Sequence, residues 1–191
     1  MLVVIDNFLD TKDPLYKEVT EDLLWDTPPR NSWTDKGQTP NNIWEAITQR
    51  VWNYASTLLP TDFDGFEYWG DQLSPNGRLT VPWHQDKDEF KHYFAKETAT
   101  LTPYVGSLYY AHTELPEGGF LQIQRGGEKD VDKFERIQPV PNRLVLFDSS
   151  SWHCVTEVTE GKRRHLASNV WISKPMEQNF HPDGFLLDDD F

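Results

Sequence analysis

The chain has 191 residues, about the size of one domain, so we expect a single domain over residues 1–191. Hydrophobic residues make up 37% and aromatic residues 14% of the chain, which is enough apolar material for a core and excludes a wholly disordered protein. The net charge of −13 opposes binding to nucleic acid or to anionic lipid, so we expect neither as a partner.

Targeting signals and membrane spans are not recognisable in the sequence. Residues 1–10 contain a short apolar run without a basic lead or a small-residue cleavage site, so we expect no signal peptide. No run of apolar residues is long enough to cross a bilayer. Cys154 is the only cysteine, which excludes an intramolecular disulfide and fits a reducing compartment. We therefore expect a cytoplasmic protein.

The first 65 residues predict a strand and two supporting helices. Val3–Phe8 is an apolar run of strand length, and Leu15, Val19 and Leu23 are spaced as in a helix within Asp10–Trp25. Thr39 as the N-cap and Pro40 as the first helical residue predict the start of a second helix. Its expected apolar face consists of Ile43, Ile47, Val51, Ala55 and Leu58. Its aromatic residues, expected to pack in the core, are Trp44, Trp52 and Tyr54.

Short strand-like runs separated by Gly, Pro and Asn follow over residues 66–175. They are Phe66–Leu73, Leu79–His84, Val105–Tyr110, Phe120–Gln124, Arg143–Phe147, Trp152–Val158 and His165–Ile172. Such runs after leading helices predict a mainly β fold with flanking helices. We expect a jelly-roll or double-stranded β-helix core like that of cupins, with the N-terminal helices packed on one sheet. Residues 176–191 contain three consecutive aspartates and are expected to form an acidic tail.

The motif with the clearest chemical meaning is His84-Gln85-Asp86. Residues two apart in a strand project from the same face, so His84 and Asp86 can reach one metal ion, although the pattern alone is common. His153 strengthens the interpretation as a metal site, because this histidine follows a buried-looking strand and a turn of small residues. Two imidazoles and one carboxylate form the facial triad that holds Fe(II) and leaves adjacent positions open, and Zn²⁺ fits the same ligands.

A basic turn, Lys162–Arg164, opens the last predicted strand, beside the strand that bears His153. A fixed cation there can receive the far carboxylate of a dicarboxylate whose other end chelates the metal, and Arg does so with two parallel hydrogen bonds. A solvated turn is the commoner meaning of such a run. Its position just after His153 favours the binding interpretation.

Taken together, these motifs resemble the Fe(II)- and 2-oxoglutarate-dependent oxygenases, in particular their prolyl 4-hydroxylase-like branch. The resemblance rests on the H-x-D motif, on the strand Leu108–Tyr110 followed by Gly118 and Gly119, on RLVLFDSSSWHCV around His153, and on the basic strand start before ASNVW. It implies a double-stranded β-helix and the cofactors Fe(II), 2-oxoglutarate and O2. It also implies that Tyr110 hydrogen-bonds the 2-oxoglutarate.

Three neighbouring residues compete for the far carboxylate of 2-oxoglutarate. Counting forward from His153, the resemblance places Arg163 where the family has its Arg or Lys, whereas counting back from Trp171 it places His165 there. In a regular strand Arg163 and His165 share a face and Arg164 points away, which favours Arg163 with His165 beside it. A bulge would reverse the face and promote Arg164.

The resemblance implies an enzyme that hydroxylates an unactivated C–H of a peptide or small-molecule substrate and forms succinate and CO2. Two alternatives remain open: a cupin-like metal enzyme that does not use 2-oxoglutarate, and a jelly-roll module that binds a ligand without catalysis. Asp88–Pro103 is long enough to cover a substrate, and Asp88 itself is expected in an exposed acidic loop. Cys154 is expected to point away from the metal site into the core.

Overall fold

Two antiparallel sheets face each other across a layer of apolar side chains in the computed structural model, which describes residues 1–94, 101–124 and 133–176. The larger sheet contains, in spatial order, β1 (Leu2–Ile5), β9 (Leu144–Phe147), β5 (Val105–Tyr110), β12 (Arg163–Trp171), β3 (Gly65–Leu73) and β2 (Ser32–Asp35). The smaller sheet contains β4 (Val81–His84), β10 (His153–Val155), β7 (Leu121–Gln124) and β8 (Phe134–Ile137). Spatial neighbours are distant in sequence, as in a jelly roll, so the predicted mainly β class is confirmed.

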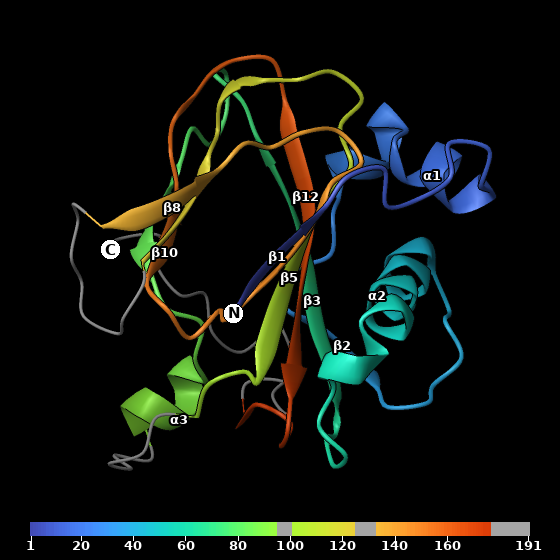
Figure 1. The fold of residues 1–191 in the computed structure, drawn as a ribbon, viewed down its shortest axis with the longest axis vertical. Helices are drawn as coiled ribbons and strands as arrows, with labels where there is room; N and C mark the ends of the chain where they lie inside the picture. The colour runs from blue at the N-terminus through green and yellow to red at the C-terminus, as the bar shows by residue number, and fades with distance from the viewer. Residues whose placement is uncertain (95–100, 125–132, 177–191) are drawn as a thin grey trace.

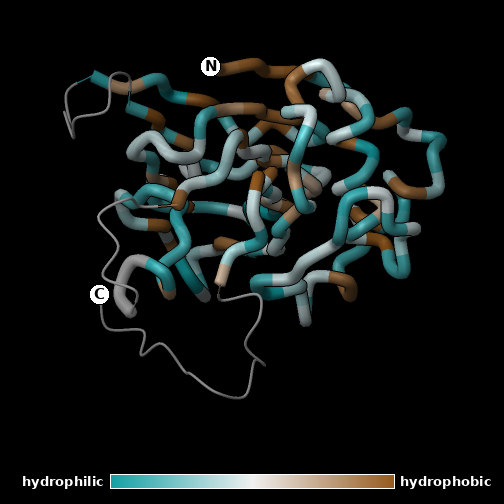
Figure 2. Tube along the Cα trace, turned by 90° about the horizontal axis from the view of Figure 1, so that it is seen from below, coloured by the Kyte–Doolittle hydropathy of each residue, from teal (hydrophilic) through white to brown (hydrophobic). Residues whose placement is uncertain are grey.

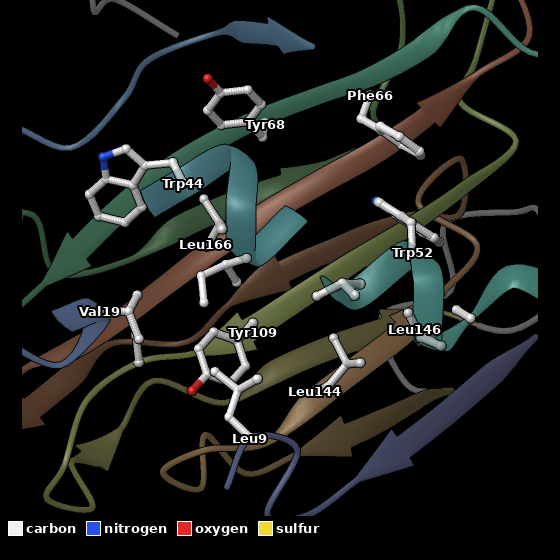
Figure 3. Packing of buried hydrophobic residues seen from close by; sticks show 14 of the residues in the cluster. Leu9, Val19, Trp44, Trp52, Phe66, Tyr68, Tyr109, Leu144, Leu146 and Leu166 are labelled. Carbon is white, nitrogen blue, oxygen red and sulfur yellow. The ribbon is translucent and has the colours of Figure 1, made fainter. Parts of the chain in front are cut away.

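Helices cover the outer face of the larger sheet (Figure 1). α1 (Pro14–Val19) and α2 (Ile43–Tyr54) pack there with the short 3-10 helices η1 (Asp22–Asp26) and η2 (Ser56–Leu58). Figure 3 shows Trp52 of α2 against Phe66 of β3; their rings are parallel within 4° and their centroids are 6.0 Å apart. The indole Nε1 of Trp52 donates to Ser168 Oγ over 2.9 Å, which fixes the helix on the sheet.

The first predicted helix is shorter than expected. Of Asp10–Trp25 only α1 is α-helical, because Thr20 ends it by turning its hydroxyl back to the carbonyl of Tyr16, and η1 follows as a separate element. Val19 is buried as predicted, but Leu23 is 81% exposed. The spacing of four residues therefore predicted the helix correctly from Leu15 to Val19, but the α-helix does not continue to Leu23.

The second predicted helix begins later than expected. Asn42, not Thr39, is the N-cap, and its side-chain oxygen accepts from the backbone N–H of Glu45 over 2.9 Å. The two tryptophans of α2 are buried as expected. Tyr54 is 61% exposed, so its expected place in the core is wrong.

The central strands β5 and β12 are buried along their whole length, because helices cover one face of the larger sheet and the smaller sheet covers the other. Along β5, Tyr109 packs with the helices while Leu108 and Tyr110 pack between the sheets. Along β12, Ala167 belongs to the layer between the sheets. Alternation therefore turns the odd-numbered residues of β12 toward that layer.

The predicted strand Trp152–Val158 is divided into β10 and β11 (Val158–Glu160), and β11 pairs with β6 (Glu117–Gly118) in a separate two-stranded sheet. Gly118 adopts a φ of 77°, and a side chain there would collide with the carbonyl oxygen of Glu157. The short strands β2, β6 and β8 and the helix α3 (Glu89–Phe94) were not predicted. The predicted tail lies outside the described residues apart from Met176.

Strand β1 forms one edge of the larger sheet, where it pairs with β9 alone. Figure 2 shows this hydrophobic N-terminal segment at the rim of the molecule. Val3 and Val4 are accordingly 38% and 42% exposed. Every helix within the described ranges is too short or too polar to span a membrane.

Candidate metal centre

Three side chains of the sequence motifs meet at one point between the two sheets. His84 and His153 are cross-strand partners on β4 and β10, and Asp86 lies two residues beyond the end of β4. Asp86 Oδ1 lies 3.5 Å from His84 Nε2 and 3.6 Å from His153 Nε2. One ligand atom from each residue lies within 4.8 Å of the other two. The geometry therefore brings together two imidazoles and one carboxylate that are separated in sequence.

Each imidazole is held with its Nε2 toward the shared space. Nδ1 of His84 lies 2.8 Å from the carbonyl oxygen of Pro82, and Nδ1 of His153 lies 2.9 Å from that of Ser151. A carbonyl oxygen only accepts, so Nδ1 carries the proton and Nε2 keeps a lone pair. Burial lowers the pKa of His153, which favours the same neutral form.

The donor atoms fit a divalent transition-metal ion. Ligands about 2.1 Å from one ion, at angles near 90–110°, lie about 3.0–3.4 Å from each other. The two distances to Asp86 Oδ1 exceed this range by only a few tenths of an ångström. Neutral imidazoles with one carboxylate form the donor set of a facial triad with open positions.

Asp86 is held by two contacts outside the metal centre. Its backbone N–H donates to the carbonyl oxygen of Ser149 over 3.0 Å. Its second carboxylate oxygen, Oδ2, accepts from the side-chain amide Nδ2 of Asn169 over 3.0 Å. Sequence reasoning gave Asn169 no role, although its odd-numbered place on β12 was a signal that it faces the same layer as the metal centre.

A cavity of about 140 Å³ adjoins the three residues. Apolar side chains that line it include Val81, Leu108, Leu121, Phe147 and Val155. Polar side chains that line it away from the metal centre include Asp71, Arg78 and His165. The cavity thus joins a metal-binding end to an end with hydrogen-bond donors.

Arg163, His165 and Tyr110 form a buried cluster near this second end. Arg163 donates from Nε to the carbonyl oxygen of Gly119 over 2.8 Å, and its guanidinium lies 5.0 Å from the centre of the Tyr110 ring. Nη1 of Arg163 lies 2.6 Å from Nδ1 of His165. Strand pairing sets Tyr110 directly opposite His165. The three side chains predicted to bind 2-oxoglutarate are therefore neighbours.

Arg163 fixes the tautomer of His165. A guanidinium only donates, so Nδ1 of His165 must accept and the ring proton must reside on Nε2. Burial, followed by the charge of Arg163, lowers the pKa of His165 well below its usual value, which keeps the ring neutral. His165 lines the cavity, whereas Arg163 is fully buried behind it. His165 is thus a neutral donor backed by a fixed positive charge.

Arg164 points to the opposite face of β12. Its Nε donates to Gln72 Oε1 over 2.7 Å and its Nη1 pairs with Asp22 at 2.6 Å. Pairing between β12 and β3 is regular from Arg163 to Trp171, so no bulge reverses the faces. The structure therefore separates Arg164 from the cavity and leaves Arg163 and His165 on its side.

Asp88 differs from its expected place in an exposed loop. It is only 1% exposed, and its carboxylate accepts from the backbone N–H groups of Lys91 and Met176. Asp88 thereby caps α3 and anchors the chain that follows β12. The expected covering segment Asp88–Pro103 begins with α3, and its residues 95–100 lie outside the described ranges.

Cys154 projects away from the metal centre, as alternation along β10 predicts. Its thiol donates to Gln122 Oε1 over 3.4 Å. Burial raises its pKa to about 11, so the group stays a neutral thiol. Cys154 therefore supplies no thiolate to the metal centre.

Comparisons with known proteins agree with this geometry. Residues 72–173 match the family described as the 2OG-Fe(II) oxygenase superfamily. A prolyl-4-hydroxylase from Pseudomonas putida has 19% identity and a TM-score of 0.55, over 89% of this chain and 91% of that chain. HygX from Streptomyces hygroscopicus, solved with nickel and 2-oxoglutarate bound, has 13% identity and a TM-score of 0.56, over 89% of this chain and 81% of that chain. No curated protein matches the sequence.

Proposed function

This chain belongs to the 2OG-Fe(II) oxygenase superfamily, and on that premise we propose that it hydroxylates an unactivated C–H bond of a peptide or small-molecule substrate. Its cofactors are Fe(II), 2-oxoglutarate and O2. The overall reaction converts substrate, 2-oxoglutarate and O2 into hydroxylated substrate, succinate and CO2. One oxygen atom enters the substrate and the other enters succinate, so the reaction needs no further reductant.

The observation that carries the proposal is the convergence of His84 Nε2, His153 Nε2 and Asp86 Oδ1 on one point. In this proposal these three atoms hold Fe(II), and the bound iron supplies the oxidising chemistry. The two Nδ1–H groups, held by backbone carbonyls, keep the imidazoles oriented as neutral ligands. No acid–base pair is required of the protein for C–H hydroxylation.

The cluster of Arg163, His165 and Tyr110 is proposed to receive the far carboxylate of 2-oxoglutarate. His165 lines the cavity, and its Nε2–H is the donor free of the bond to Arg163. Tyr110 is paired with His165 across the strands, and its hydroxyl accepts from Nη2 of Arg163 over 3.4 Å. Arg163 supplies the positive charge that a buried carboxylate requires and holds His165 in the donating tautomer. We therefore keep the prediction that Arg163 and His165 bind the far carboxylate of 2-oxoglutarate, and propose that His165 makes the direct contact with it.

The remaining cavity wall is proposed to exclude water from the reacting atoms. Leu108, Leu121 and Phe147 line the cavity, whose volume is about 140 Å³. The prime substrate then approaches from the side of His84, whose side chain is 39% exposed. Prolyl peptides are the first substrates to test, because the similar solved structures include an enzyme named as a prolyl-4-hydroxylase.

The proposal is tested by measuring succinate formation from 2-oxoglutarate with purified protein, Fe(II) and O2. We expect turnover in the wild type, its loss in His84→Ala and Asp86→Ala, and its retention in His112→Gln, a buried histidine outside the metal centre. Thermal unfolding with Mn²⁺ is followed with and without 2-oxoglutarate. Stabilisation by Mn²⁺ but not by 2-oxoglutarate would favour a cupin-like metal enzyme, and no effect of either would contradict a metal centre.

A further inference from the structure

Asn169 lies between the metal centre and the loop that precedes His153. Its amide Nδ2 donates to Asp86 Oδ2 over 3.0 Å, and its Oδ1 accepts from the hydroxyl of Ser149 over 3.0 Å. Asn169 is 2% exposed and Ser149 is fully buried. Both ends of the amide are therefore occupied, in the only orientation that gives the carboxylate a donor.

The backbone leaves space for this arrangement. Gly106 of β5 pairs with Asn169 on β12, and a Cβ atom at Gly106 would lie 2.6 Å from Asn169 Oδ1 and 2.7 Å from Ser149 Cβ. Any side chain at this position would displace the amide or the hydroxyl. The absence of a side chain at Gly106 thus permits the hydrogen bonds that run from Ser149 through Asn169 to Asp86.

The two carboxylate oxygens of Asp86 consequently face different partners. Oδ2 is occupied by Asn169, while Oδ1 faces Nε2 of His84 and Nε2 of His153. Free rotation of the carboxyl group would exchange the oxygens or turn both toward an ion. The hydrogen bond from Asn169 opposes that rotation.

We propose that Asn169 is a positioning residue that holds Asp86 as a ligand through Oδ1 alone, with Ser149 fixing the orientation of the Asn169 amide. The inference rests on the metal centre of the proposed function. A carboxylate limited to one oxygen leaves more of the metal's coordination positions for 2-oxoglutarate and O2. Asn169 acts through Asp86 and does not need to touch the substrate.

Metal binding to the metal-free protein tests the proposal without turnover. Mn²⁺ affinity is measured by calorimetry, and the visible absorption of the Co²⁺-loaded protein reports the coordination of the ion. We expect Asn169→Ala to weaken Mn²⁺ binding about 10- to 100-fold and to change the Co²⁺ spectrum. Ser149→Ala, which leaves the direct donor in place, is expected to give a smaller change and serves if Asn169→Ala does not fold.

Ser168→Ala is the matched control. Ser168 is the preceding residue on β12, equally buried, and it bonds Trp52 and Ser107 on the helix side of the sheet. Its loss is expected to lower stability while Mn²⁺ affinity and the Co²⁺ spectrum stay unchanged. Wild-type affinity in Asn169→Ala, or an equal loss in Ser168→Ala, would overturn the role of Asn169. Failure of the wild type to bind either ion would instead overturn the metal centre itself.

Discussion

Arg163 and His165 are joined by a hydrogen bond of 2.6 Å between a guanidinium nitrogen and Nδ1 of the imidazole. Both side chains are almost completely buried, and they share the face of β12 that looks toward the smaller sheet. The neutral ring of His165 therefore lies between the cavity and the positively charged guanidinium of Arg163. This relationship distinguishes the two adjacent arginines, because Arg164 is bonded to Asp22 and Gln72 on the other face.

Substitution of the two arginines is expected to change different properties: cosubstrate affinity for Arg163 and stability for Arg164. Arg163→Met removes the charge behind His165 and the donor that fixes its tautomer, and should weaken 2-oxoglutarate binding about 10- to 100-fold. Arg164→Met should leave this affinity unchanged and lower only the stability. The measurement is the dissociation constant of 2-oxoglutarate in the Mn²⁺-loaded protein. Equal losses in both variants would show that Arg163 has no specific role in binding.

Asn142 connects the N-terminal segment to the larger sheet, and its replacement is expected to destabilise the fold. Its side chain accepts from the backbone N–H of Leu9 and the Tyr109 hydroxyl and donates to the carbonyl of Leu9. Asn142→Ala leaves these buried groups unpaired and should lower the free energy of unfolding by about 2–4 kcal/mol in urea titrations. Asn142→Asp keeps the acceptor but places a buried carboxylate against the carbonyl oxygen of Leu9, so it should be destabilised as well. A change below about 0.5 kcal/mol in the Ala variant would contradict this assignment.

Asp88→Ala is expected to lower stability through two lost contacts. Its carboxylate caps α3 at Lys91 and holds the backbone N–H of Met176, and the side chain is almost fully buried. The expected cost is about 1–3 kcal/mol, measured by urea unfolding. Asp88→Asn keeps a good capping side chain and should retain more stability than Asp88→Ala. Indistinguishable stabilities of the two variants would argue against the capping role.

Stability is expected to fall as the pH decreases from 7.5 to 5.5. Burial lowers the pKa of His112 below 6.5, despite its hydrogen bond to the Pro139 carbonyl, so the folded protein binds fewer protons than the unfolded chain in this range. Stability therefore rises with pH between the folded pKa and 6.5, by at most about 1.4 kcal/mol per pH unit for one group. His165 contributes in the same direction.

The pH dependence is measured by urea unfolding of the metal-free protein at several pH values. His112→Gln should unfold with a smaller dependence on pH, even if its stability at pH 7.5 is lower. If the stability of His112→Gln depends on pH as strongly as that of the wild type, the pKa of His112 does not differ between the folded and unfolded states.

The sequence predicted those parts of the fold in which local pattern and burial agree. Val105–Tyr110 was predicted with the bounds that the structure gives β5, because the run follows Pro103 and is rich in residues that favour strands, namely Val105, Leu108 and two tyrosines. Strands β2 and β8 were missed, because they are short and lie at the edges of their sheets, where few apolar residues are required. The end of α1 was missed because Thr20, not a proline or glycine, terminates it.

The site could be predicted as far as residue types and strand parity allow. The resemblance and the H-x-D spacing indicated His84, Asp86 and His153, which the fold brings together. Asn169 could not be assigned a role, because its contact with Asp86 depends on how β12 packs against the end of β4. Such contacts between distant segments are tertiary, and neither propensity nor spacing encodes them.

The alternation of Arg163 and Arg164 restricts how the turn after β11 can change in length. If a single-residue deletion or insertion at Gly161 were passed on to β12, the register of β12 against β3 and β5 would shift by one position. Arg164 would then take the cavity side and lose its contact with Asp22. If Arg163 serves the cosubstrate as proposed, length changes at this turn should come in pairs of residues, because two residues restore the same face of β12.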